Sequence, residues 1–196
     1  MYRQDTVDKL YLTALDLFLR NGFENVSVQD ICEAVGITKP TFYKFVPSKE
    51  ALLEKFYDDD IEQSHPWWAD VKDGNYWQAI MKGLDLHFEH FTKYGLDLYT
   101  ALHVSNLKDR KSSLELNPRF FARLIDLVAK AQEAGQILCR EDPVEVARIL
   151  CCMRAGHGLY WCLSRDEDPA MKDFQREMAS AVQVPEQYFR EAHYED

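Results

Sequence analysis

The hydrophobic residues of this chain recur every three or four positions along most of its length, which is the spacing of one face of an α-helix. The first such stretch runs from Val7 to Phe18 and ends at Asn21-Gly22, where glycine suits the left-handed residue that stops a helix. The rest of the chain shows no alternation of apolar and polar residues of the kind that indicates a strand. The pattern therefore predicts an all-α fold.

Two very short helices are predicted near the N-terminus. Ser27 can N-cap the first, and Asp30 occupies the acidic position of a capping box three residues later. Gly36 can end this helix, and Thr38 can cap the second one at once. Pro40 falls within the first turn of the second helix, where a missing N–H group costs nothing.

The second of these helices has a polar outer face. Its aromatic residues Phe42 and Phe45 can turn inward, which leaves the following residues largely outside: Lys39, Thr41, Tyr43 and Lys44. A helix so short buries too little to be stable alone. Its polar face therefore predicts a surface for a partner, and a helix-turn-helix that enters a DNA groove fits this description.

Three short motifs follow one another in this segment: Val35-Gly36-Ile37, Phe42-Tyr43 and Ser48-Lys49. In these motifs and their spacing the chain resembles the TetR family of transcriptional regulators. The resemblance implies a three-helix helix-turn-helix DNA-binding domain at residues 1–50, with a connecting helix from residue 48. It also implies a helical effector-binding and dimerisation domain at residues 51–196.

The resemblance also assigns roles within the DNA-binding domain. It implies contacts to DNA from Ser27, Val28, Gln29, Thr38, Lys39, Pro40, Thr41, Tyr43, Lys44 and Lys49. Lys39, Pro40 and Thr41 would face base edges, since lysine can donate to guanine O6 and N7. Tyr43, Lys44 and Lys49 would hold backbone phosphates, which accept from hydroxyl and ammonium groups.

The net charge of −10 disfavours indiscriminate binding to nucleic acid. Residues 1–50 are nearly neutral, with six Lys and Arg against seven Asp and Glu. One such domain contributes few cations to DNA. Affinity is therefore expected from two domains in a homodimer, which would bind a palindromic double-stranded operator.

The remaining apolar stripes predict further helices. They are expected at 48–63, 77–91, 96–107, 118–131, 144–163 and 169–184, with a polar loop at 108–116. Gly156 and Gly158 lie inside the penultimate helix, where small residues let another helix approach. TetR-like proteins pair through their last two long helices, and the expected interface residues are Met153, Gly156, His157, Tyr160, Phe174 and Met178. Ordinary packing within the chain is the alternative.

The middle of the chain is rich in aromatic residues, and a TetR-like protein holds its effector pocket there. The expected lining is Trp77, His87, Phe91, His103 and Phe121, which suits an apolar or aromatic small molecule. An aromatic stripe at helical spacing is also typical of plain core. The spacing of His87, His90 and His103 would allow them to share a metal or to hydrogen-bond an effector. No carboxylate or thiol completes a metal-ligand spacing around them, so a core or surface role is favoured, and no metal and no cofactor is expected.

The leading hypothesis is a repressor that a small effector releases from DNA. The alternatives are an enzyme, or a small-molecule-binding all-α protein with a vestigial DNA-binding head. No nucleophile–base signature, phosphate loop or dinucleotide fingerprint supports an enzyme. Five cysteines without paired metal-ligand spacing indicate reduced thiols in a cytoplasmic protein, and no apolar run is long enough to predict a membrane span.

Overall fold

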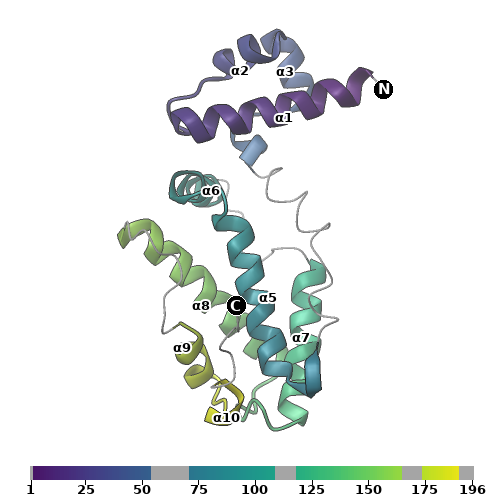
Figure 1. Ribbon diagram of the computed structural model, residues 1–196, viewed down its shortest axis with the longest axis vertical. Coiled ribbons are helices and arrows are strands. Elements are labelled where there is room, and N and C mark those ends of the chain that lie inside the picture. Colours follow the sequence, from purple (N-terminus) through teal and green to yellow (C-terminus); the bar gives the residue numbers. More distant parts are fainter. Residues whose placement is uncertain (1, 54–70, 109–117, 165–173, 190–196) are drawn as a thin grey trace. The chain divides into compact units, whose positions relative to one another are not determined.

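The computed structural model describes residues 2–53, 71–108, 118–164 and 174–189, which are helical apart from turns and short connections (Figure 1). These residues contain no β-strand. The elements are α1 (Tyr2–Asn21), α2 (Val28–Val35), α3 (Lys39–Phe45), η2 (Lys72–Gly74), α5 (Tyr76–Thr92), α6 (Leu96–Lys108), α7 (Pro118–Glu133), α8 (Pro143–Ser164), α9 (Phe174–Ala181) and α10 (Glu186–Phe189). The predicted all-α fold is confirmed.

Contacts divide the chain into two compact units. The first comprises residues 1–63 and 90–110, and the second comprises residues 64–89 and 111–196. The division falls within α5. The boundary expected at residue 50 separates a DNA-binding domain from an effector-binding domain. This division by function stays a prediction.

The first unit is built around α1, with α2 and α3 lying on one side of it (Figure 1). Its core contains Ile31 and Cys32 of α2 and Phe42 of α3, which are almost fully buried, and the inward turn of Phe42 agrees with the sequence prediction. Helix α6 belongs to the same core through Leu98, Ala101 and Leu102. The first unit therefore joins the helix-turn-helix to a helix that lies far along the sequence.

The core of the second unit comes from α5, α7, α8 and α9, and α7 packs along α8. Its largest fully buried side chains include Trp77, Ile80, Leu84, Leu124 and Phe174. Gln136 connects two of these elements, since its Oε1 accepts from the Trp77 N–H at 3.0 Å and its Nε2 donates to Gly74 O at 2.7 Å. This buried side chain fixes the start of α5 against the end of α7.

The predicted helices agree with the structure where both can be compared. Helix α7 begins at Pro118 as expected, and α8 begins at Pro143, one residue before its expected start. Most of the helix expected at 48–63, the loop at 108–116 and the start of the helix at 169–184 lie outside the described residues. The short elements η2 and α10 were not predicted, because a single turn shows no apolar periodicity.

Candidate nucleic-acid interface

The caps predicted for α2 are present. The Asp30 N–H donates to Ser27 Oγ at 3.2 Å, and the Ser27 N–H donates to Asp30 Oδ2 at 2.7 Å, which completes the capping box. Hydrogen bonds from the Ser27 side chain and backbone lower the pKa of Asp30. At the other end Gly36 has a φ of 82° and its N–H donates to Cys32 O at 2.9 Å. Local sequence signals thus fix both ends of α2.

A second cap follows at once and begins α3. The Thr41 N–H donates to Thr38 Oγ1 at 3.4 Å, and the two threonine hydroxyl oxygens lie 2.9 Å apart. Phe42 is fully buried and anchors the helix in the core. The ring of Tyr43 meets the ring of Phe42 edge to face at 5.3 Å, while Tyr43 itself remains 53% exposed.

Most residues predicted to contact DNA are exposed. The exposed ones are Ser27, Gln29, Thr38, Lys39, Pro40, Tyr43 and Lys44, and the half-buried ones are Val28, Thr41 and Lys49. The Thr41 hydroxyl already interacts with Thr38, so base contact at this position would use the methyl group or a shared hydroxyl. The structure gathers the α3 residues on one short helix, and their contact with DNA stays a prediction.

Lys49 differs from the lysines of α3. Its ammonium group donates to Phe23 O at 2.8 Å and to Val26 O at 3.0 Å. The same group lies 4.0 Å from the centroid of the Phe23 ring. The sequence predicted that Lys49 binds phosphate, but these contacts direct its ammonium group into the protein.

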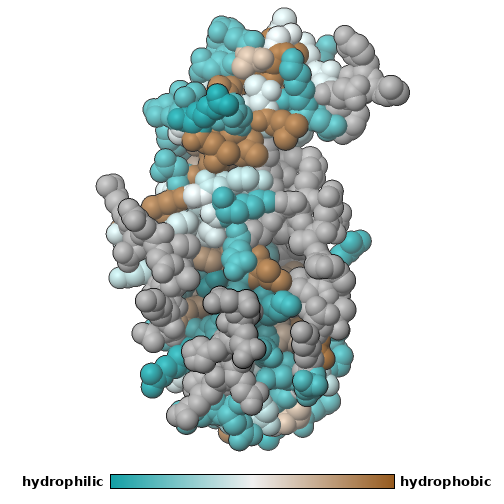
Figure 2. Space-filling model, in the orientation of Figure 1, coloured by the Kyte–Doolittle hydropathy of each residue, from teal (hydrophilic) through white to brown (hydrophobic). Residues whose placement is uncertain are grey.

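Helix α8 presents apolar residues to solvent. Those on its exposed stripe are Ile149, Leu159, Tyr160 and Leu163, at 39%, 47%, 56% and 74% exposure. A Cβ atom added at the exposed Gly156 would meet nothing within 4 Å, so the stripe is open at this point. In the view of Figure 2, hydrophilic residues cover most of the described surface and hydrophobic ones gather in a few patches.

The predicted dimer residues divide into two groups. Met153, Gly156 and Tyr160 lie on α8 and are half-buried or exposed. Phe174 and Met178, by contrast, are 2% and 0% exposed in the core of the second unit. Their predicted contact with a partner is therefore corrected, since the inner face of α9 packs on its own chain.

His157 also faces its own chain. Its ring lies 3.9 Å from the Phe174 ring between centroids, and its Nε2 lies 3.1 Å from Glu177 Oε2. The sequence assigned His157 to a dimer contact because it stands between two glycines. In the structure it connects α8 to α9.

The residues predicted to line an effector pocket do not gather around one described cavity. Trp77 is 1% exposed and belongs to the core of the second unit. His87 stacks on Phe120 at 4.5 Å between centroids, and Phe121 packs half-buried against the same core. His103 lies in the first unit beside Tyr99, and the side chain of Phe91 lies outside the described residues.

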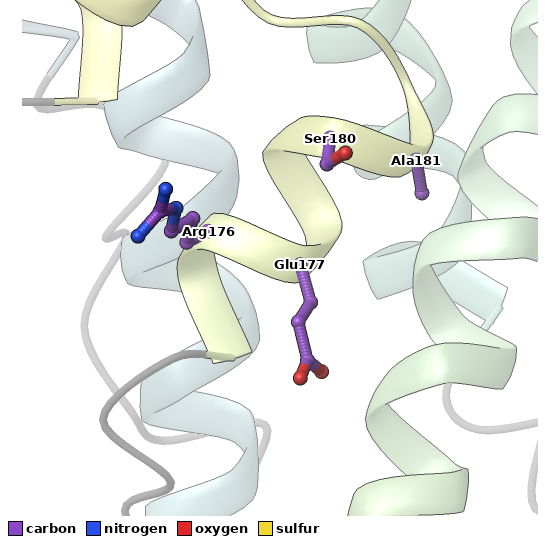
Figure 3. Close-up of a pocket in the computed structure, with 4 residues that line it drawn as sticks. All are labelled: Arg176, Glu177, Ser180 and Ala181. Carbon is purple, nitrogen blue, oxygen red and sulfur yellow. The ribbon is translucent and has the colours of Figure 1, made fainter.

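A hollow of about 600 Å³ lies elsewhere, against α9. Its described lining is Arg176, Glu177, Ser180 and Ala181. All four side chains come from one helix, and those of Arg176 and Glu177 point in different directions (Figure 3). This described lining includes no aromatic side chain and is open to solvent, which does not match the aromatic pocket expected from the sequence. Among the described residues no group of three or more side chains could hold a metal ion.

A buried ion pair connects α5 and α8. Arg154 lies 3.3 Å from Asp85, and their side chains are 11% and 22% exposed. The guanidinium carbon lies 3.8 Å from the Phe88 ring centroid and 4.5 Å from that of Phe174. Burial raises the pKa of Asp85, while Arg154 opposes this shift. The sequence carries no local signal for this pair, because the partners lie on helices that are distant in the chain.

His157 should make the stability of the protein depend on pH. Burial lowers its pKa below the ordinary value of 6.5, and this outweighs the opposing effect of Glu177. The folded protein then binds fewer protons than the unfolded chain, so the free energy of unfolding falls as the pH drops below 6.5. We expect His157→Gln to flatten this dependence in urea unfolding followed between neutral and mildly acidic pH. A variant curve parallel to that of the unsubstituted protein would contradict this assignment.

Comparison with known proteins places this geometry in a family. Residues 10–56 match the model of the bacterial regulatory proteins of the tetR family. The regulator EthR of Mycolicibacterium smegmatis is 32% identical over 111 residues, which are 55% of this chain and 47% of EthR. The chain thus covers less than half of that relative. The repressor NemR of Escherichia coli K12 is 26% identical over 180 residues, or 84% of this chain and 88% of NemR.

Solved structures share the fold. The reduced form of E. coli NemR has a TM-score of 0.59 at 19% identity and covers 93% of this chain and 99% of its own. The TetR regulator TylP of Streptomyces fradiae has a TM-score of 0.57 at 19% identity, covering 97% and 92%. None of the described helices is long and apolar enough to span a membrane. With its cap–turn–cap geometry and the family-model match, residues 10–56 form an N-terminal domain of the tetR type, and the chain is similar to TetR-family transcriptional regulators.

Proposed function

We propose that this protein is a homodimeric repressor that binds a palindromic double-stranded operator through α3 and leaves it when a small effector binds. The observation that carries the proposal is the pair of adjacent caps around Gly36, which fixes a short helix with an exposed polar face. A helix of that length, held at its base by Phe42, suits entry into a major groove. The similar protein NemR is named a transcriptional repressor, which supports repression as the proposed effect on transcription.

Base reading is assigned to the start of α3. Lys39, Pro40 and Thr41 stand in its first turn, and Lys39 and Pro40 are exposed. Tyr43 and Lys44 follow on the same helix and are also exposed, so we assign them to backbone phosphates. Few cations are available in one domain, which favours two domains on one operator.

Dimerisation is assigned to the exposed stripe of α8. Its residues repeat at helical spacing, from Ile149 through Gly156 to Leu163, and apolar side chains on such a stripe are typical of a helix–helix contact. A second copy is the expected occupant because a palindromic operator requires two reading helices related by a twofold axis.

The effector is assigned to the second unit, beside His87 and Phe121. The His87 ring stacks on Phe120, and Phe121 is only partly buried against the core, whereas Trp77 is 1% exposed. An apolar or aromatic compound would suit this surrounding. Trp77 is better described as core, so its truncation would test stability rather than effector response.

Two substitutions test the DNA-reading assignment, with an operator selected from a random duplex pool as the probe. Lys44→Met should weaken binding to all sequences and make the plot of log affinity against log salt shallower by about 0.9 for each lost contact. Thr41→Ala should change the preference among operator variants, by about 1–3 kcal/mol at one base position. Lys130→Met on α7 is the matched control and should change neither quantity.

The same measurement separates the alternatives. An enzyme or a binding protein with a vestigial head would select no operator, and its affinity for DNA would not respond to Lys44→Met or Thr41→Ala. Intact operator binding by both variants would show that α3 is not the reading helix.

A further inference from the structure

The last residue of α2 and the segment that leads into its N-cap both accept hydrogen bonds from lysine ammonium groups that come from outside the helix-turn-helix. Lys9 of α1 donates from Nζ to Val35 O at 3.0 Å, and Val35 is the last residue of α2. Lys49 donates from Nζ to Phe23 O at 2.8 Å and to Val26 O at 3.0 Å. Those two carbonyls belong to the segment that leads into the N-cap of α2.

The chemistry of the acceptor carbonyl groups explains why a lysine ammonium group lies beside each of them. The last carbonyl groups of a helix lack intrahelical donors and lie at the negative end of its dipole, so the Val35 carbonyl favours a cation. Phe23 and Val26 are 5% and 2% exposed, which keeps much of the solvent away from the contacts of Lys49. The Phe23 ring adds a cation–π contact at 4.0 Å.

The position of α3 depends on this arrangement. Only the turn at Gly36 and Ile37 separates α2 from the cap of α3, and α3 has just seven residues. A change in the direction of α2 would therefore also change the direction of α3, because the turn between them is short. Lys9 fixes the end of α2 next to this turn, and Lys49 fixes its beginning.

We propose that Lys9 and Lys49 are positioning residues for DNA reading: they hold α2, and through it α3, in the orientation that fits the groove, without contacting DNA. The proposal rests on the proposed role of α3 as the reading helix. Without either ammonium group, α2 and α3 would sample more orientations. The apparent operator affinity would then fall in proportion to the fraction of molecules in the fitting one.

The salt dependence of binding distinguishes positioning from phosphate contact. Lys49→Met keeps the length of the side chain and removes its donor, so operator affinity should fall about tenfold, the scale of a hydrogen bond from a charged donor. Lys9→Met should cost less, because Lys9 is exposed. In both variants the slope of log affinity against log salt should stay unchanged, whereas loss of a phosphate contact would make it shallower by about 0.9.

Arginine at position 49 gives a second discrimination. Arginine binds phosphate at least as well as lysine, so a phosphate contact would survive Lys49→Arg. Its guanidinium group is larger and planar, so it can replace the compact ammonium group only if the Phe23 and Val26 carbonyls or the Phe23 ring shift. Positioning therefore predicts that Lys49→Arg also loses operator affinity at every salt concentration.

Lys44→Met is the matched control, since Lys44 is an exposed lysine on α3. It should change the salt slope but leave the backbone amide NMR shifts of residues 36–41 in the DNA-free protein nearly unchanged. Lys49→Met should leave the salt slope unchanged and should shift the backbone amide signals of residues 36–41.

Three outcomes would overturn the proposal: full operator affinity in both methionine variants, a shallower salt slope for Lys49→Met, or full affinity in Lys49→Arg. Should Lys49→Met fail to fold, Lys9→Met and Lys49→Arg decide the matter by the same criteria. If Lys44→Met and Thr41→Ala leave binding intact while Lys49→Met weakens it at an unchanged salt slope, the proposed function fails because α3 is not the reading helix, and the lysines then position another part of the domain.

Discussion

Replacing Leu159 and Leu163 together with glutamate is expected to convert the proposed dimer to a monomer and to lower operator affinity at least about a hundredfold. Both residues are on the exposed stripe of α8, at 47% and 74% exposure. Two glutamates from each copy would place four like charges in a desolvated contact. The loss of affinity follows because two linked reading helices bind far more tightly than one.

Sedimentation velocity at micromolar concentration measures the first effect, and titration of the operator measures the second. Leu107→Glu is the matched control, because Leu107 is also 74% exposed but lies on α6 in the first unit. It should leave both the dimer and operator affinity unchanged. A double variant that still sediments as a dimer would place the interface elsewhere.

Gly156→Leu tests the same interface without adding charge. A Cβ atom at this position meets nothing within 4 Å in its own chain, and leucine favours helix more than glycine does. The isolated chain should therefore fold as well as before, while the side chain blocks close approach of a partner helix. Cys152, the one exposed cysteine of the five, lies one turn earlier and allows crosslinking with a short bismaleimide. Crosslinked dimer should form in the unsubstituted protein and decline in Gly156→Leu.

Replacing Arg154 with leucine is expected to lower the free energy of unfolding by about 3–5 kcal/mol. The substitution leaves the buried Asp85 without its cation, although Gln175 still donates to it at 3.0 Å. It also removes the guanidinium group from the faces of Phe88 and Phe174. Urea unfolding followed by tryptophan fluorescence measures the change, since Trp77 and Trp161 belong to the same unit.

Two controls separate burial from charge. Arg148 pairs with Glu145 at 2.6 Å on the same helix, but both side chains are about half exposed, so Arg148→Leu should cost less than about 1 kcal/mol. Adding Asp85→Asn to Arg154→Leu removes the unpaired charge and should recover part of the stability. Equal losses for Arg148→Leu and Arg154→Leu would contradict the view that burial makes the Asp85 pair important.

The prediction of local structure from sequence succeeded where the deciding interactions are short in range. The capping box of Ser27, the left-handed Gly36 and the helix starts at Pro118 and Pro143 each depend on residues within a few positions of one another. The placement of Phe42 and Phe45 also identified which face of α3 would be turned inward. Such features are encoded locally, because backbone conformation and helix periodicity do not require a distant partner.

The tertiary structure decided which surface covers each face and where each long side chain ends. Periodicity showed that α9 has an apolar face but not that Phe174 and Met178 pack on their own chain rather than on a partner. Lys49 reads as a surface cation in the sequence, yet backbone carbonyls more than twenty residues away in the chain hold its ammonium group. Asp85 and Arg154 carry no local signal at all, since only the packing of α5 on α8 brings them together. Contacts of this kind join residues distant in sequence, so they are determined by how the helices pack and not by any pattern within one helix.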